Sequence, residues 1–208
     1  MIETIFFDFD GVLTLNEDWY AAMSQEISKS SWIDFQDIKN SLSNYRLELA
    51  LWTLTFEQIR WEFCKSVWLE MSLDDFYATI VPALPKNEEM FALARDLRRN
   101  WTAVWIITNN PQQRFDVLSD LRWISHTFSV AALPVHVWWL KNEKEIFEYA
   151  LTEAWISAQE AIFIDNKEKN LRVPADLGFA TFHFDTYLQD MDALTTFLAT
   201  HDIDVSQA

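Results

Sequence analysis

Two aspartates near the start of the chain, Asp8 and Asp10, stand two residues apart directly after an apolar run. The run, residues 5–7, is typical of a buried strand, and strand side chains two apart project to the same side. Gly11 then lets the backbone turn tightly. Two close carboxylates repel unless a cation or a proton lies between them. The pair therefore indicates either a divalent-metal site or an acid/base group beside a nucleophilic carboxylate, with solvated acids at a strand end as the alternative.

The pattern of the second half of the chain predicts the sheet that would position these acids. Helical and strand-like segments alternate, which is typical of a parallel, doubly wound α/β sheet. In such sheets ligands bind at the carboxyl ends of the strands. The expected strands are residues 103–108, a weaker 128–130, 161–165 and 180–184, and the expected helices are 87–99, 111–121, 142–154, 170–177 and 186–199.

Between the acids and this alternation lies a stretch that is almost entirely helical in pattern. Ser72 followed by Asp75 resembles a helix N-terminal cap with an acid in the first turn. We therefore expect a Rossmann-like core formed by residues 1–16 and 84–208, and a small all-helical domain, residues 17–83, placed to cover the acids. The helices expected in that domain are residues 18–29, 34–48, 55–66 and 72–80.

Polar side chains follow two further expected strands. Thr108 and Asn109 precede a helix N-terminus, where a hydroxyl and an amide form a natural contact for a phosphate or an oxyanion; a plain helix cap is the alternative. Asp165 ends another strand, and its oxygen would help complete a Mg²⁺ site, unless it is an exposed acid that caps the next helix.

One lysine is a candidate for holding negative charge at this edge. Lys141 precedes the helix at 142–154 and could neutralise a phosphate or the acids as a compact point charge. Lys144 is a nearby competitor, and a solvated lysine is the alternative for both.

In this order, the four groups resemble the four motifs of the haloacid dehalogenase-like (HAD) hydrolase superfamily, in its phosphatase type with a helical cap inserted after the first motif. The resemblance covers about residues 4–184. The first motif matches almost letter for letter, and the third, a lone lysine, is weak. The matching segments are residues 8–14, residues 107–110, Lys141, and residues 163–166 through Asn170.

The resemblance implies a mechanism for the matching residues. Asp8 would attack phosphorus and form an aspartyl-phosphate, and Asp10 would act as the general acid and then as the general base. Thr108, Asn109 and Lys141 would hold the phosphoryl oxygens. Mg²⁺ would be bound by Asp8, by the backbone carbonyl of Asp10 and by Asp165.

The implied activity is a Mg²⁺-dependent phosphatase acting on a small phosphorylated metabolite, a sugar or nucleotide phosphate. Asp10 favours phosphoryl transfer, because dehalogenases of the superfamily need no acid there. A sugar phosphomutase shares all four motifs and stays an alternative. A catalytically impaired binding protein is another, since Asn166 stands where a second acid is common and the prolines common after the motif lysine are absent.

Composition limits the partners and the compartment. The 208 residues carry 32 acids and 16 bases, a net charge of −16, which argues against nucleic acid and anionic membranes as partners. The lone cysteine, Cys64, rules out an internal disulfide and suits the cytoplasm. We expect neither a signal peptide nor a membrane span, and a monomer or homodimer.

The glycine and tryptophan counts, 2 and 11, are abnormal. Average usage would give roughly 15 glycines. Several tryptophans stand where turns and helix ends favour glycine. One hypothesis is that these codons are UGA, read as glycine in the source organism; a genuinely tryptophan-rich protein is the alternative. The residues concerned are Trp32, Trp52, Trp68, Trp101, Trp123 and Trp155.

Overall fold

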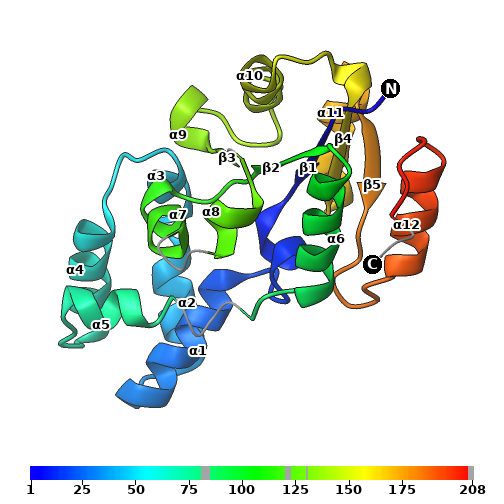
Figure 1. Ribbon diagram of the computed structural model, residues 1–208. Helices are drawn as coiled ribbons and strands as arrows, with labels where there is room; N and C mark the ends of the chain where they lie inside the picture. Colours follow the sequence, from blue (N-terminus) through cyan, green and yellow to red (C-terminus); the bar gives the residue numbers. More distant parts are fainter. Residues whose placement is uncertain (81–84, 120–122, 130, 206–208) are drawn as a thin grey trace.

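The fold is built around a parallel sheet of five strands in the order β3-β2-β1-β4-β5 (Figure 1). The structure is a computed structural model that describes residues 1–80, 85–119, 123–129 and 131–205. β1 lies in the middle and pairs with β2 on one side and β4 on the other, which confirms the expected doubly wound α/β fold. The strands are β1 (Thr4–Phe7), β2 (Ala103–Ile107), β3 (Ala131–Ala132), β4 (Ala161–Asp165) and β5 (Ala180–His183).

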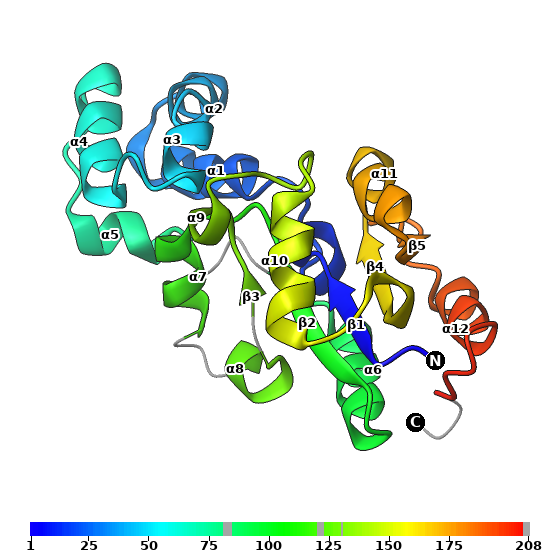
Figure 2. The same ribbon diagram turned by 90° about the horizontal axis from the view of Figure 1, so that it is seen from above.

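Helices cover both faces of the sheet, as the apolar run of β1 requires. Ile5 and Phe7 pack in the cluster that includes α6 and α12, whereas Phe6 packs in the cluster that includes α10 and α11. Alternate side chains of one strand thus serve two separate cores, with the two layers of helices on either side of the strands (Figure 2). These helices are α6 (Glu88–Arg99), α10 (Glu145–Ala154), α11 (Glu168–Leu177) and α12 (Met191–Ala199).

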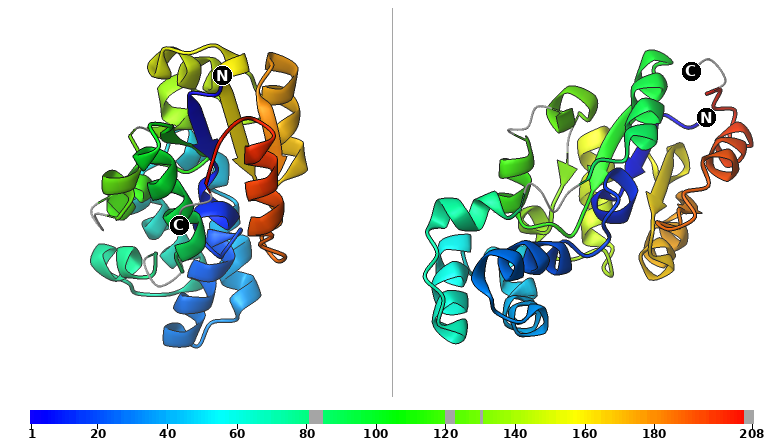
Figure 3. Two further views of the ribbon diagram at one scale, coloured as in Figure 1. Left: turned by 45° about the vertical axis from the view of Figure 1, so that its right-hand side comes forward. Right: turned by 90° about the horizontal axis from the view of Figure 1, so that it is seen from below.

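Among the described residues, the five α-helices between β1 and α6 gather beside the sheet rather than on its faces, and together form the helical insertion (Figure 3). Polar caps start several of them: the Ser72 hydroxyl accepts a hydrogen bond from the Asp75 amide at 3.0 Å, as the sequence predicts, and Thr55 and Gln58 form a reciprocal capping box. The helices are α1 (Trp19–Ser31), α2 (Phe35–Ser43), α3 (Arg46–Ala50), α4 (Phe56–Val67) and α5 (Leu73–Ala78).

The two chain segments that connect the insertion to the core run side by side. Thr14 and Lys86 form an antiparallel bridge. The Leu15 amide donates to the Pro85 carbonyl at 2.8 Å, and the Asn87 amide donates to the Leu13 carbonyl at 3.0 Å. Entry to the insertion and exit from it are therefore joined by backbone hydrogen bonds.

Several expected elements differ in extent. The helix expected at 34–48 is two helices, because the Asn44 amide bonds back three residues to Ser41 and Tyr45 leaves helical dihedral angles. The helix expected from residue 186 begins only at Met191, after Gln189 takes a positive φ. The weak strand expected at 128–130 is replaced by β3, while residue 130 lies outside the described residues. The first residues of α10 and α11 also differ from those expected, as do the bounds of α7 (Gln112–Ser119), while α8 (Trp123–Thr127) and α9 (Pro134–Val137) were not expected.

Tryptophans occupy the left-handed backbone conformations of the described chain. Of the eight non-glycine residues with positive φ, six are tryptophans, and both glycines, Gly11 and Gly178, also have positive φ. A residue with a Cβ enters this region at a cost of roughly 1–2 kcal/mol, which glycine avoids. Trp123 instead begins α8, and Trp138 joins the set without having been singled out. The six are Trp32, Trp52, Trp68, Trp101, Trp138 and Trp155.

Within the described chain, no helix has the length and apolar character needed to cross a bilayer.

Candidate active site

The residues singled out at strand ends meet at one edge of the sheet. Asp8 directly follows β1, Thr108 directly follows β2, and Asp165 is the last residue of β4. Because the three strands are adjacent and parallel, their carboxyl ends open on the same side. A cavity of about 760 Å³ lies there, lined by Asp8, Asp10, Thr108, Asn109 and Lys141 and by residues of the helical insertion.

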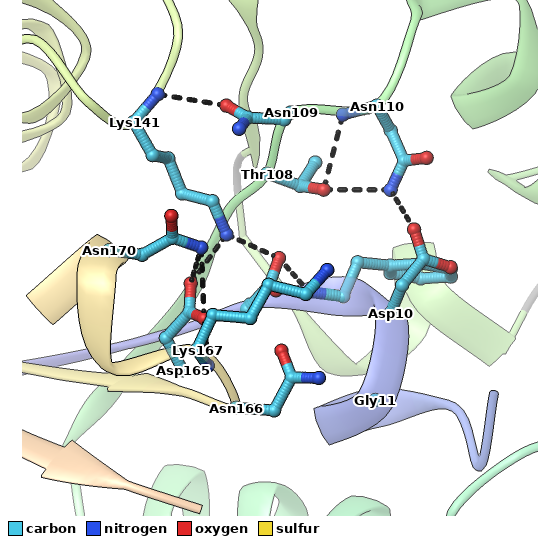
Figure 4. Close-up of polar contacts among 12 residues, drawn as sticks. Asp10, Gly11, Thr108, Asn109, Asn110, Lys141, Asp165, Asn166, Lys167 and Asn170 are labelled. Carbon is cyan, nitrogen blue, oxygen red and sulfur yellow. Dashed lines mark hydrogen bonds and ion pairs between the residues drawn. The ribbon is translucent and has the colours of Figure 1, made fainter. Parts of the chain in front are cut away.

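Lys141 lies between the two strand-end carboxylates, and Figure 4 shows its side chain reaching toward Asp165. Its Nζ is 2.7 Å from Asp8 Oδ1 and 2.5 Å from Asp165 Oδ2, and its side chain is only 2% exposed. Lys144, the competitor, is exposed and pairs with Glu148 at 2.8 Å. The structure thus brings Lys141, and not Lys144, to the acids.

One ammonium group serves two buried carboxylates in this cluster, so one negative charge is left over when both carboxylates are ionised. Burial, together with the charge of Asp165, raises the pKa of Asp8 to about 7, against the lowering effect of Lys141. Burial alone would lower the pKa of Lys141, but the carboxylates of Asp165 and Asp8 raise it above its ordinary value. Lys141 is therefore a cation at neutral pH, and the cluster would accept a further positive charge.

Asp165 is oriented by its own loop. Asn170 Nδ2 donates to both carboxylate oxygens at 3.0 Å, and the Lys167 amide donates to Oδ1 at 2.8 Å (Figure 4). Asn109 acts on Lys141 in a similar way, because its Oδ1 accepts from the Lys141 backbone amide at 2.9 Å. Asn109, expected to hold a phosphoryl oxygen, thus positions the loop that carries the lysine and also lines the cavity.

The Asp10 side chain is held by different partners from those of Asp8. Arg114 of α7 contacts both of its carboxylate oxygens, at 2.7 and 3.0 Å, and Asn110 Nδ2 donates to Oδ2 at 2.9 Å. Asn110 Nδ2 also donates to the Thr108 hydroxyl at 2.7 Å. Sequence reasoning missed Arg114, because an arginine near the start of a helix is usually solvated and nothing in its spacing marks it as buried.

The loop after Asp10 packs tightly on the loop after β4. Gly11 has φ of +86°, and a Cβ on it would lie 2.3 Å from Asn166 Nδ2 and 2.7 Å from the Thr186 hydroxyl oxygen. Asn166 Oδ1 is buried and has no hydrogen-bond partner within the described structure. A buried oxygen without a donor, on the residue that follows Asp165, suits a hydrated, hard divalent cation.

A ready-made cluster of acidic, histidine or cysteine ligands is nevertheless absent from the part of the chain that the structure describes. Asp8 and Asp165 converge on the Lys141 ammonium group, while the Asp10 carboxylate faces Arg114. Of the three residues expected to bind metal, two therefore offer side-chain oxygens to one point, and Asp10 would have only its backbone carbonyl to offer. The donors are all oxygens, which matches the preference of Mg²⁺.

Known structures share this architecture. No protein-family model matches the sequence. The structure superposes on the HAD family enzyme bt-2542 of Bacteroides thetaiotaomicron with a TM-score of 0.74 at 20% identity, over 93% of this chain and 98% of that one. The chain has the haloacid dehalogenase-like fold. A HAD-like family hydrolase of Porphyromonas gingivalis has the same fold, with a TM-score of 0.73 at 21% identity over 95% of this chain and 98% of that one.

Two findings accompany the haloacid dehalogenase-like fold. The enzyme bt-2542 has been solved in complex with magnesium and inorganic phosphate, at a TM-score of 0.71 to this chain. Among curated proteins, the sesquiterpene phosphatase astK of Aspergillus oryzae is 27% identical over 100 residues. That match spans about half of each protein, 48% of this chain and 51% of the phosphatase.

Proposed function

We propose that this protein is a Mg²⁺-dependent phosphatase that hydrolyses a small phosphorylated metabolite through an aspartyl-phosphate on Asp8. The observation that carries the proposal is the convergence of Asp8, Lys141 and Asp165 at one cavity, with Asp10 two residues from Asp8 and also lining that cavity. The match to astK and the magnesium and phosphate complex of bt-2542 support it.

The first chemical step would transfer the phosphoryl group to the protein. A carboxylate oxygen of Asp8 attacks phosphorus, a bond forms between them, and the bond from phosphorus to the leaving oxygen breaks. Asp10 gives its proton to that leaving oxygen, so the product departs as an alcohol. Lys141 and the Thr108 hydroxyl would stabilise the phosphoryl oxygens.

The second step would return the enzyme to its starting state. A water molecule attacks phosphorus and gives its proton to Asp10, while the bond between Asp8 and phosphorus breaks. Inorganic phosphate leaves, Asp8 is again a carboxylate and Asp10 is again protonated. Both protons are thereby accounted for.

Mg²⁺ would be held by Asp8, Asp165 and the backbone carbonyl of Asp10, and the amide oxygen of Asn166 would accept a hydrogen bond from a water bound to the ion. When bound, the ion offsets negative charge between the carboxylates and the phosphoryl group. The fit rests on the excess negative charge of the cluster and on the partnerless oxygen of Asn166.

We also propose that the helical insertion, residues 17–83, is a cap domain on a core of residues 1–16 and 84–208. Aromatic side chains of the insertion line the cavity. The ring centres of Trp19 and Tyr20 lie 3.8 Å apart, and the Arg46 guanidinium carbon lies 4.4 Å from the Tyr20 ring centre. An aromatic wall with a cation suits the organic part of a sugar or nucleotide phosphate.

The test is phosphate release from p-nitrophenyl phosphate and from a panel of sugar and nucleotide phosphates, with and without Mg²⁺. The Asp8→Asn variant should lose activity by about a thousandfold or more, because the nucleophile is removed. Lys144→Met is the matched control and should retain activity. Equal rates for wild type and Asp8→Asn would refute the proposal, and an isomerised sugar phosphate without phosphate release would identify a mutase.

A further inference from the structure

Arg114 is a fully buried arginine next to the cavity, and its environment is unusual for that residue type. Its side chain is 0% exposed. Buried arginines are rare unless a carboxylate pairs with them. The partner here is Asp10, which Arg114 grips with two parallel hydrogen bonds, from Nη2 to Oδ1 at 2.7 Å and from Nη1 to Oδ2 at 3.0 Å.

The surroundings fix the guanidinium plane as well. Its central carbon lies 4.5 Å from the ring centre of Trp19 and 5.5 Å from that of Phe9. Asn110 contacts both partners: its Oδ1 accepts from Arg114 Nη1, and its Nδ2 donates to Asp10 Oδ2 at 2.9 Å. The Asp10 carboxylate is thus held in one orientation by three donors, two from Arg114 and one from Asn110.

We propose that Arg114 is the positioning residue for Asp10: its two-pronged grip holds the Asp10 carboxylate in one orientation at the wall of the cavity. The inference rests on the proposed phosphatase function, in which Asp10 exchanges a proton with the leaving oxygen and then with water. Both transfers need a carboxyl group within hydrogen-bond reach of the reacting oxygen. A lysine could keep the charge but not the planar, two-pronged geometry.

If Arg114 positions Asp10, the effect of an Arg114 variant depends on the leaving group of the substrate. The value of kcat/KM reports events up to the first irreversible step, here the loss of the leaving group. The p-nitrophenolate ion is a good leaving group and departs without a proton. The phenolate ion is a poorer leaving group, so its departure depends more on a proton from Asp10. A misplaced Asp10 should therefore lower kcat/KM for phenyl phosphate much more than for p-nitrophenyl phosphate, and should lower kcat for both, because attack by water still needs the base.

The experiment measures kcat and KM for both substrates with saturating Mg²⁺ in wild type, Arg114→Lys and Arg114→Met. Arg99→Met is the control, since Arg99 is exposed and pairs with Asp96 on its own helix. In the Arg114 variants we expect kcat/KM for phenyl phosphate to fall by about 10- to 100-fold. This is only a part of the full contribution of an acid/base group, because Asp10 itself is still present. For p-nitrophenyl phosphate, kcat and KM should fall together, so that kcat/KM changes by less than about threefold.

Equal losses of kcat/KM on both substrates would overturn the inference, because a merely structural defect does not distinguish leaving groups. Unchanged kinetics in Arg114→Lys would overturn it too. If Arg114→Met fails to fold, Arg114→Lys and Asn110→Ala provide the same comparison. Failure of the proposed function reads differently: wild type itself would lack Mg²⁺-dependent activity, or Asp8→Asn would match it.

A second inference rests on the backbone alone. We infer that the six tryptophans with positive φ are glycines in the protein as its source organism makes it. The three at the ends of α1, α4 and α10 have φ of 61°, 54° and 58° and exposed fractions of 101%, 96% and 90%, so neither backbone preference nor packing accounts for tryptophan there. A code that reads UGA as glycine produces this placement.

The test is tryptic mass spectrometry of the protein isolated from its source, together with the codons of its gene. The peptide of residues 100–114 contains Trp101, and that of residues 145–167 contains Trp155. Glycine masses at both positions, with UGA codons, are the expected result. Tryptophan at both positions, or UGG codons, would overturn the inference.

Discussion

Replacing four exposed tryptophans that have left-handed backbone conformations by glycine should stabilise the tryptophan-containing protein. At each of these positions the fold demands a positive φ, and the indole side chain contacts almost nothing, with at least 90% of its surface exposed. Relief of the left-handed strain is worth roughly 1–2 kcal/mol, and the greater unfolded-state entropy of glycine returns about 0.5–1 kcal/mol. The four are Trp32, Trp68, Trp101 and Trp155.

The net gain is therefore about 0.5–1 kcal/mol at each site. The sites follow four different helices and share no partner, so their effects should add to about 2–4 kcal/mol. For a chain of this size that corresponds to a rise in Tm of roughly 4–16 °C. Urea unfolding followed by circular dichroism measures the free energy directly and does not depend on tryptophan fluorescence.

Two controls separate backbone strain from other effects of removing an indole ring. Alanine at the same four positions removes the ring but keeps the Cβ, and so should give little of the gain. Trp61→Gly, within α4, should instead lower the free energy of unfolding by about 1 kcal/mol, because glycine is a poor helix former. The reasoning is refuted if the quadruple glycine variant unfolds at the same or a lower urea concentration than its parent.

Three further predictions concern the site. Without divalent cations, the free energy of unfolding should be lower at about pH 8 than at about pH 6. The reason is that the raised pKa of Asp8 makes the folded state hold a proton that the unfolded chain releases. In Asp8→Asn the free energy of unfolding should change less between these two pH values, and an equal change in both proteins would contradict the prediction. Lys141→Met should lower the free energy of unfolding in urea by about 3 kcal/mol or more, because two buried carboxylates lose their counter-ion. Lys144→Met should change this free energy little, and equal effects of the two substitutions would count against Lys141 as the counter-ion of the carboxylates. Gly11→Ala should lower both Tm and activity, because its Cβ would meet Asn166 at 2.3 Å; an unchanged Tm would show that the loop relaxes.

The part of the site that the sequence predicted depends on strand topology. Asp8, Thr108 and Asp165 each follow an apolar run, and adjacent parallel strands bring their carboxyl ends together whatever the details of packing. The strand at 161–165 was predicted to the residue, because its apolar run is bounded by clear helix signals. Local pattern and one general rule of sheets sufficed for these features.

The part that was missed depends on contacts between distant segments. Arg114 is buried because Asp10, more than a hundred residues earlier in the chain, pairs with it, and no local pattern encodes that pairing. The choice between Lys141 and Lys144 likewise depended on which side chain reaches the acids. The break between α2 and α3 came from Asn44 and Tyr45, which a helical period of apolar residues does not reveal.

The antiparallel bridge between Thr14 and Lys86 has a consequence for how the molecule could be rebuilt. The two segments that connect the insertion to the core already lie as far apart as the strands of a hairpin. The core should therefore tolerate deletion of the helical insertion, with the two segments joined by a short glycine-containing turn. The same geometry would allow an unrelated domain to be inserted between these two segments without disturbing the strand ends of the sheet. For the proposed phosphatase, the part that would select the organic group and the part that would act on phosphorus could then be changed independently.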